Sequence, residues 1–111
     1  MVEPTRVLTR TFGAVAWLVA ASGRRAGRDT RLGRSTSIGR DGLRNDIVLD
    51  DSAVSATHAK IRLERGRFVL YDLGSTNGTL VNRRRVQKHT LVDGDEILVG
   101  RSAFVFKEVR R

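Results

Sequence analysis

The chain of 111 residues contains no cysteine. This excludes a disulfide scaffold, an iron–sulfur cluster and a zinc site built on thiolates. Its two histidines, His58 and His89, lack the close spacing of metal ligands, so we expect no metal site and no cofactor. The absence of cysteine fits a reducing compartment, and a cytoplasmic location is the expectation. The length corresponds to one domain with a core of its own.

The sequence also lacks an apolar run of the ~18 residues that a membrane-spanning helix needs, so no membrane association is expected. One apolar segment, residues 14–21, follows Arg6 and Arg10 and resembles the h-region of a short signal peptide. Glu3 in front of the segment and Trp17 inside it argue against that interpretation. A buried strand explains the same residues.

Negative charge is scarce. Lysine and arginine number 21 against 12 acidic residues, which gives a formal charge of +9. A basic surface attracts anions such as nucleic acid, anionic lipid or phosphorylated protein. Aromatic residues make up 5% of the chain, and most of them occupy strand positions that look like core rather than a platform for stacking bases. A basic nucleic-acid-binding β domain therefore stays as the alternative function.

The hydrophobic pattern indicates strands, and no helix is needed anywhere. Ala59, Ile61 and Leu63 alternate with polar residues, which is the period of a strand with one face in the core. Arg65-Gly66 then turns the chain into a hairpin with residues 67–72. Short strands separated by turns every eight to twelve residues predict an antiparallel β-sandwich with its loops gathered at two ends. The other strands are expected at residues 14–21, 29–33, 35–39, 46–49, 79–81, 96–99 and 103–109, with a turn at 82–85.

Three predicted loops carry residues suited to binding a phosphate. The loop at residues 72–79 contains Asn77-Gly78, a pair that tolerates positive φ and can hold a side-chain amide at a fixed place. Gly39-Arg40 and the segment 55–58 supply an arginine and hydroxyls. A dianionic phosphate needs a fixed cation and two or more neutral donors, and arginine offers a planar fork for it.

The order of these motifs resembles a forkhead-associated (FHA) domain. Gly39-Arg40, Ser55-x-x-His58 and Asn77-Gly78 occur in the family's order, and the resemblance covers about residues 14–109. It implies a sandwich of about eleven strands that binds phosphothreonine peptides through loops at one end. It assigns Arg40, Ser55 and Thr76 to the phosphate, Asn77 to the peptide main chain, and Gly39, His58 and Gly78 to support of the loops.

The same resemblance implies a partner that is phosphorylated on threonine, either a Ser/Thr protein kinase or its substrate, and a role in kinase signalling or assembly. Residues 1–12 are expected to be a flexible tail and residues 13–111 the binding domain. Thr5, Thr9 and Thr11 lie in that tail, so the chain's own phosphorylated tail is another candidate ligand.

Two positions depart from the family pattern. Ala56 stands where many members place an asparagine or arginine after the signature serine, so one phosphate donor is missing or is replaced by Thr57, Arg44 or backbone N–H groups. Arg83 stands where members often have glycine. It begins a run of three arginines that is either a solvated turn or a patch favouring acidic residues in the ligand.

A hydrolase using Ser55, His58 and Asp50 or Asp51 is the remaining alternative. No nucleophile elbow or oxyanion motif accompanies these residues. The chain also has no P-loop, no zinc-protease motif and no dinucleotide fingerprint. We therefore expect no catalytic residue and no enzymatic activity.

Overall fold

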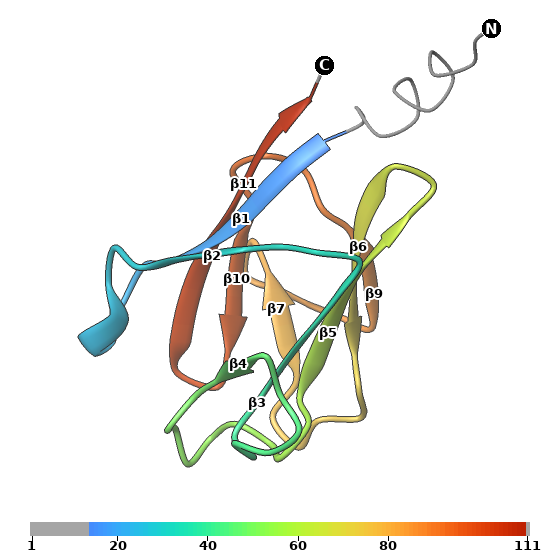
Figure 1. Cartoon of the computed structure of the whole chain (residues 1–111). Coiled ribbons are helices and arrows are strands. Elements are labelled where there is room, and N and C mark those ends of the chain that lie inside the picture. The colour runs from blue at the N-terminus through green and yellow to red at the C-terminus, as the bar shows by residue number, and fades with distance from the viewer. Residues whose placement is uncertain (1–13, 111) are drawn as a thin grey trace, which may run out of the picture.

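The computed structural model describes residues 14–110, which form eleven strands in two sheets (Figure 1). The predicted tail of residues 1–12, with its three threonines, and Gly13 at the start of the predicted domain lie outside the described residues. The six-stranded sheet has the order β2 (Asp29–Arg31), β1 (Ala14–Ala20), β11 (Ser102–Arg110), β10 (Glu96–Val99), β7 (Thr79–Val81) and β8 (Arg84–Val86). The five-stranded sheet has the order β4 (Ile47–Val48), β3 (Ser35–Gly39), β5 (Ala59–Glu64), β6 (Arg67–Asp72) and β9 (Lys88–Thr90).

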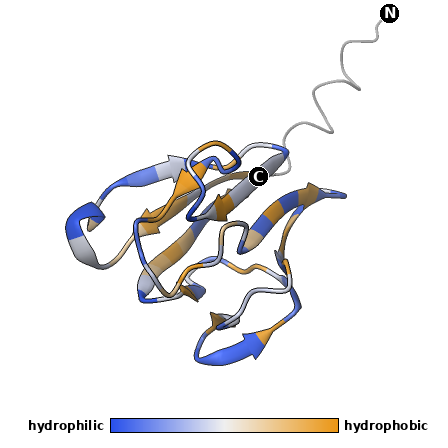
Figure 2. Ribbon diagram, turned by 90° about the horizontal axis from the view of Figure 1, so that it is seen from below, coloured by the Kyte–Doolittle hydropathy of each residue, from blue (hydrophilic) through white to orange (hydrophobic). Residues whose placement is uncertain are grey.

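Alternating side chains explain most of these strands. In β5, Ala59 and Ile61 are buried, and the next residue, Arg62, is exposed. Figure 2 shows this alternation as orange and blue bands along the strands. Leu63 was expected to point inward, but it lies at the hairpin end of β5 and is 39% exposed. The apolar run 14–21 forms β1, as the strand interpretation predicts.

The core lies between the two sheets. Phe68 of β6 and Phe106 of β11 are both buried, and their ring centroids are 5.8 Å apart at an interplanar angle of 58°. A tilted pair at this distance is a favourable arrangement of aromatic rings. Because one ring comes from each sheet, the contact fixes how the sheets face each other. The predicted all-β sandwich is confirmed.

Two local features differ from the predictions. Strands β3 and β4 pair in parallel, Ile38 with Ile47 and Gly39 with Val48, so the sandwich is not wholly antiparallel. The loop 40–46 turns the chain back on itself, and a two-residue edge strand then runs beside β3 in the same direction. A single 3-10 turn, η1 (Gly23–Arg25), interrupts the loop after β1, where no helix was expected. No helix among the residues described is long and apolar enough to cross a membrane.

The strand register gathers several connections at one end of the sandwich. Ala59 pairs with Ile38 and Asp72, which places the β3–β4, β4–β5 and β6–β7 loops together. Val99 pairs with Thr79, and Ala20 pairs with Phe104, so the β10–β11 turn and the β1–β2 segment lie at this end too. We call it the loop end. The opposite end, with the tight turns at residues 65–66 and 82–83, is called the far end.

Candidate functional site

Ser55 joins three loops at the loop end. Its hydroxyl Oγ accepts a hydrogen bond of 3.1 Å from the backbone N–H of Thr76, and its carbonyl accepts one of 3.0 Å from the N–H of Arg40. Arg40 and Thr76 are exposed and Ser55 is half-buried. The structure therefore brings the three predicted phosphate-binding residues together, because the backbones of Arg40 and Thr76 both bond to Ser55.

Gly39 allows the β3–β4 and β4–β5 loops to touch. A Cβ atom on Gly39 would lie 2.3 Å from the carbonyl oxygen of Ala56 and 2.7 Å from the amide of Asn45. That carbonyl accepts hydrogen bonds from Asn45 Nδ2 at 2.7 Å and from the N–H of Asp41 at 3.2 Å. No real Cβ approaches backbone so closely, so only glycine permits the contact that holds Arg40 beside Ser55.

His58 links the β4–β5 and β6–β7 loops through a fully buried ring. Its Nδ1 accepts a hydrogen bond of 3.0 Å from the backbone N–H of Ser55. Its Nε2 lies 2.9 Å from the carbonyl oxygen of Gly78. A nitrogen that accepts carries no proton, so the ring is the neutral tautomer with hydrogen on Nε2, which donates to Gly78. The site therefore depends on an uncharged histidine.

Asn77 is exposed at the tip of the β6–β7 loop. Its Nδ2 donates a hydrogen bond of 2.9 Å to the carbonyl of Ala53 in the β4–β5 loop. This bond uses one of the two amide hydrogens and leaves the side-chain carbonyl and the second hydrogen to meet a ligand. Gly78, which follows, has a φ of 85°, and a Cβ there would lie 2.6 Å from Nε of Arg85. Arg85 thus packs directly against the loop.

Asp72 organises the inside of the β6–β7 loop. Its carboxylate accepts hydrogen bonds from the Ser75 hydroxyl at 2.5 Å, the Ser75 N–H at 3.0 Å and the Thr79 hydroxyl at 2.7 Å. Burial acts to raise the pKa of Asp72, but these hydrogen bonds outweigh it and leave the pKa lowered. Ser75 in turn accepts the N–H of Gly78 at 2.9 Å. An ionised carboxylate therefore sets the loop's shape.

The structure shows what surrounds the position of Ala56, which departs from the family pattern. Arg44, one suggested replacement for the missing donor, is exposed and forms an ion pair with Asp41, with 3.3 Å between Nε and Oδ2. Thr57, the other side chain suggested, is half-buried.

The hydrogen bonds do not form a hydrolytic triad. His58 accepts the backbone N–H of Ser55 rather than its hydroxyl, and its other nitrogen faces a carbonyl. The carboxylate of Asp51 is bonded instead to the N–H of Ala53 and Arg101 and to the hydroxyl of Ser102. Within residues 14–110, no group of three His, Cys, Asp or Glu residues could hold a metal ion.

Most of the aromatic rings are inside the protein, as the sequence predicts. Phe68, Phe104 and Phe106 are buried. Trp17 and Tyr71 are half-buried on strands, and the Tyr71 hydroxyl donates to the carboxylate of Glu64. Phe12 lies outside the residues described. The rings in the described part of the chain do not form an exposed row on which bases could stack.

Sequence reasoning gave no role to three residues that shape the site. Asn45 precedes the predicted strand 46–49 and Asp72 begins the loop 72–79, but neither position says which groups the side chain binds. Arg85 was assigned to a turn, whereas it lies in β8 opposite Leu80. Its contact with Gly78 follows from that pairing, which a shorter predicted turn of residues 82–83 would have indicated.

Comparisons with known proteins agree with this geometry. The family model of the FHA domain matches residues 36–100. The glycogen accumulation regulator GarA of Mycolicibacterium smegmatis is 43% identical over 82% of this chain, and the oxoglutarate dehydrogenase inhibitor of Corynebacterium efficiens is 41% identical over 82%. The chain spans 58% and 64% of those two proteins. The structure of EmbR from Mycobacterium tuberculosis with a low affinity phosphopeptide superposes with a TM-score of 0.76, at 37% identity, over 93% of this chain and 28% of EmbR.

Proposed function

The chain belongs to the FHA domain family, and on that basis we propose that it is a phosphothreonine-dependent protein-binding module. The observation that carries the proposal is the meeting of three loops at Ser55, which accepts the backbone N–H groups of Arg40 and Thr76, two exposed residues. A phosphate with two negative charges is bound well by one planar cation and several neutral donors.

In the proposed complex, Arg40, Ser55 and Thr76 hold the phosphate, and Asn77 binds the ligand main chain beside the phosphothreonine. An amide presents a C=O and an N–H that match those of an extended peptide. Gly39, His58 and Gly78 act indirectly, because their contacts hold the loops in place.

The proposed partner is a protein phosphorylated on threonine by a Ser/Thr kinase, or the kinase itself. This follows the family and the phosphopeptide bound to EmbR. The proposal includes a cytoplasmic location and a role in binding rather than in catalysis. GarA is named a regulator and its corynebacterial relative an inhibitor of an enzyme, and binding a phosphorylated partner is a means by which this chain could act similarly.

The test is fluorescence polarisation with a labelled phosphothreonine peptide library, with unphosphorylated and phosphoserine versions as controls. Replacing Arg40→Ala is expected to weaken binding about 30-fold, which corresponds to about 2 kcal/mol for a charge-assisted contact. Phosphoserine should bind about fourfold more weakly, because one buried methyl contributes about 0.8 kcal/mol. Binding should also weaken below about pH 6, where the phosphate loses its second charge.

The matched control is Arg34→Ala, which removes the same charge from an exposed arginine at the far end. It should change affinity less than twofold. Equal binding by the Arg40→Ala and Arg34→Ala variants would show that the phosphate is not held at this site. Binding of the unphosphorylated peptide with the same affinity would overturn the proposed function itself.

A further inference from the structure

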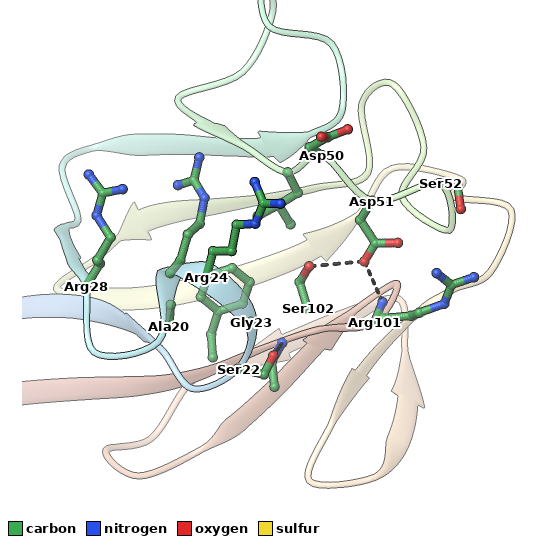
Figure 3. Close-up of a pocket in the computed structure, with 14 residues that line it drawn as sticks. Ala20, Ser22, Gly23, Arg24, Arg28, Asp50, Asp51, Ser52, Arg101 and Ser102 are labelled. Atoms are coloured by element: carbon green, nitrogen blue, oxygen red, sulfur yellow. Dashed lines mark hydrogen bonds between the residues drawn. The ribbon is translucent and has the colours of Figure 1, made fainter.

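A hollow at the loop end is not lined by the phosphate-binding residues. It measures about 800 Å³ and lies between the β1–β2 segment, the start of the β4–β5 loop and the β10–β11 turn (Figure 3). All three belong to the loop end. Its charged lining residues are Arg24, Arg25, Arg28, Arg101, Asp50 and Asp51. We call it the arginine hollow.

The arginines of the hollow are exposed and uncompensated. In the part of the chain that the structure describes, none of the four has a carboxylate within ion-pair distance. Figure 3 shows Arg24 and Arg28 extending in the same direction from the β1–β2 segment, while Arg101 comes from the β10–β11 turn on the other side of Asp51. Cations gathered on a concave surface attract an anion more strongly than the same charges spread over a flat one.

Of the two aspartates in the lining, Asp51 is already engaged. Its Oδ1 accepts the N–H of Ala53 at 2.9 Å, and its Oδ2 accepts the Arg101 N–H at 2.8 Å and the Ser102 hydroxyl at 3.1 Å. Burial acts to raise the pKa of Asp51, yet these hydrogen bonds outweigh it and the pKa is lowered. Asp51 therefore links the β4–β5 loop to the β10–β11 turn, two of the segments that line the hollow. Asp50 is exposed, and it is the one other carboxylate to offset four guanidinium groups.

Backbone hydrogen bonds hold the arginine-bearing segment in place. The N–H of Ala20 bonds to the carbonyl of Arg28 and the N–H of Arg28 to that of Arg25, both at 2.8 Å. Ser22 Oγ accepts the N–H of Ala103 in β11 at 3.1 Å. The arginine side chains thus project from a backbone that is already ordered, so anion binding does not cost backbone entropy.

The hollow and the phosphate site share the β4–β5 loop. Ser52 lines the hollow and Ser55 belongs to the phosphate site. Three residues of chain span at most about 11 Å, so the edge of the hollow at Ser52 lies within that distance of Ser55. An extended peptide advances about 3.3 Å per residue, so three to five residues cover this separation together with a side chain.

We propose that the arginine hollow is a second anion subsite for the same ligand, which receives a carboxylate or a second phosphate three to five residues from the phosphothreonine. This rests on the proposed phosphothreonine binding. Each arginine offers a fork that fits a carboxylate or phosphate. The hollow therefore selects phosphoproteins whose phosphothreonine lies in an acidic or multiply phosphorylated segment.

The experiment compares peptides that share one phosphothreonine and differ in a single position. The reference peptide has neutral flanks. In the second series, each peptide carries one glutamate, placed at one of the positions one to six residues before or after the phosphothreonine. In the third series, a second phosphothreonine takes the place of that glutamate. For the wild-type chain, a glutamate at the favoured positions should tighten binding about threefold to fivefold. A second phosphate should tighten it about tenfold, because it carries more negative charge and has more acceptor oxygens than a carboxylate. The comparison of the last two series separates carboxylate from phosphate as the source of the anion.

The test variant is Arg24→Ala with Arg28→Ala, and the control is Arg34→Ala with Arg67→Ala, two exposed arginines of the far end. Both remove two positive charges. The test variant should lose the gain from the acidic residue and still bind the neutral peptide within twofold of wild type. The control should keep the gain. Thermal unfolding of both variants verifies that these exposed substitutions leave the fold intact.

The outcomes separate the two proposals. Failure of every phosphothreonine peptide to bind the wild-type chain would remove the proposed function. Binding of the neutral peptide, with no gain from an acidic residue at any position, would overturn the subsite alone. A gain that persists in the test variant would also overturn it. A single-stranded oligothymidylate that binds the wild-type chain and not the test variant, with no acidic gain in the peptides, would assign the hollow to nucleic-acid phosphates instead.

Discussion

The two histidines occupy opposite ends of the sandwich and are used differently. At the loop end, His58 is fully buried and bonds to two backbone groups, the N–H of Ser55 and the carbonyl of Gly78. At the far end, His89 is half-buried, and its Nε2 lies 3.1 Å from Oδ2 of Asp95. Both hydrogen bonds of His58 fit the tautomer with its hydrogen on Nε2, whereas the partner of His89 is a carboxylate. His58 thus joins the loops of the proposed site without adding a charge of its own.

An aspartate stands at the centre of each end. Asp72 accepts three hydrogen bonds within the β6–β7 loop, and Asp95 accepts those of the Val92 N–H, Asn82 Nδ2 and His89 Nε2. Burial acts to raise the pKa of Asp95, but these bonds outweigh it, so the pKa of Asp95 is lowered as that of Asp72 is. Both ends depend on an ionised carboxylate. The ends differ in what the carboxylate holds: a ligand loop at one, tight turns at the other.

The largest effect should come from replacing His58, which joins the β4–β5 and β6–β7 loops. His58→Ala leaves a buried N–H and a buried carbonyl without partners and opens a cavity, which together cost roughly 3–5 kcal/mol. Phosphothreonine binding should be lost with it, because the β4–β5 and β6–β7 loops are no longer joined. Chemical denaturation and peptide titration at low temperature measure the two effects.

His89→Ala is the matched variant at the other end. Its ring is partly exposed and has one hydrogen bond, so we expect a loss of about 1 kcal/mol and unchanged peptide affinity. If the two substitutions cost the same stability and the same affinity, the distinction between the ends would be wrong.

The next largest effect is the dependence of the free energy of unfolding on pH. A carboxylate with a lowered pKa in the folded state stabilises the protein above its unfolded value of 3.8, and this contribution disappears as the pH falls through the lower folded value. The wild-type free energy of unfolding should therefore drop below about pH 4. Asp72→Asn and Asp95→Asn should each cost about 1.5–3 kcal/mol at pH 7 and make that drop shallower.

Binding separates the two variants. Asp72→Asn should also weaken phosphothreonine binding, because Ser75 and the turn at Gly78 depend on the charged oxygen. Asp95→Asn should leave affinity unchanged. A variant with asparagine at position 72 that binds normally would show that the β6–β7 loop keeps its shape without the carboxylate.

The sequence predicts the strands that alternate clearly and the turns that need special residues. The hairpin of β5 and β6 follows from the pattern around Ile61 and from Arg65-Gly66. Strands β8 and β9 are three residues long and have few apolar residues, so no hydrophobic period marks them. The predicted turn of residues 82–85 overlaps β8, and no strand was predicted at β9. The parallel pairing of β4 depends on how the loop 40–46 folds back, which local propensity does not contain.

The candidate site divides in the same way. The residue types suited to phosphate are evident in the chain, but that Ser55 meets the backbone of Thr76 follows from the tertiary structure. The family resemblance supplied this association before the structure did. The arginine hollow was not predicted, because its arginines come from segments about 75 residues apart, and only the pairing of Ala20 with Phe104 brings them together.

The two ends of the sandwich also differ in which residues adopt positive φ. At the loop end, the residues with positive φ are glycines, namely Gly23, Gly27, Gly74, Gly78 and Gly100 among the described residues. At the far end, Arg65, Asn82 and Arg83 adopt positive φ with side chains. Asparagine tolerates this region, but arginine in it costs roughly 1–2 kcal/mol. Strain is thus placed away from the proposed ligand.

Arg83→Gly should relieve that strain. Arg83 has a φ of 70° in the two-residue turn between β7 and β8, where glycine is favoured. The relief exceeds the entropy that glycine adds to the unfolded chain, about 0.4–1 kcal/mol, so we expect a net gain of about 0.5–1 kcal/mol and a melting temperature about 2–8 °C higher. The substitution Arg84→Gly, at an exposed position in the adjacent strand, should instead destabilise the protein.

Because the turn lies at the far end, affinity for a phosphothreonine peptide with neutral flanks should stay within twofold for Arg83→Gly. A loss of affinity without a loss of stability would mean that Arg83 reaches the ligand and that the two ends are not independent.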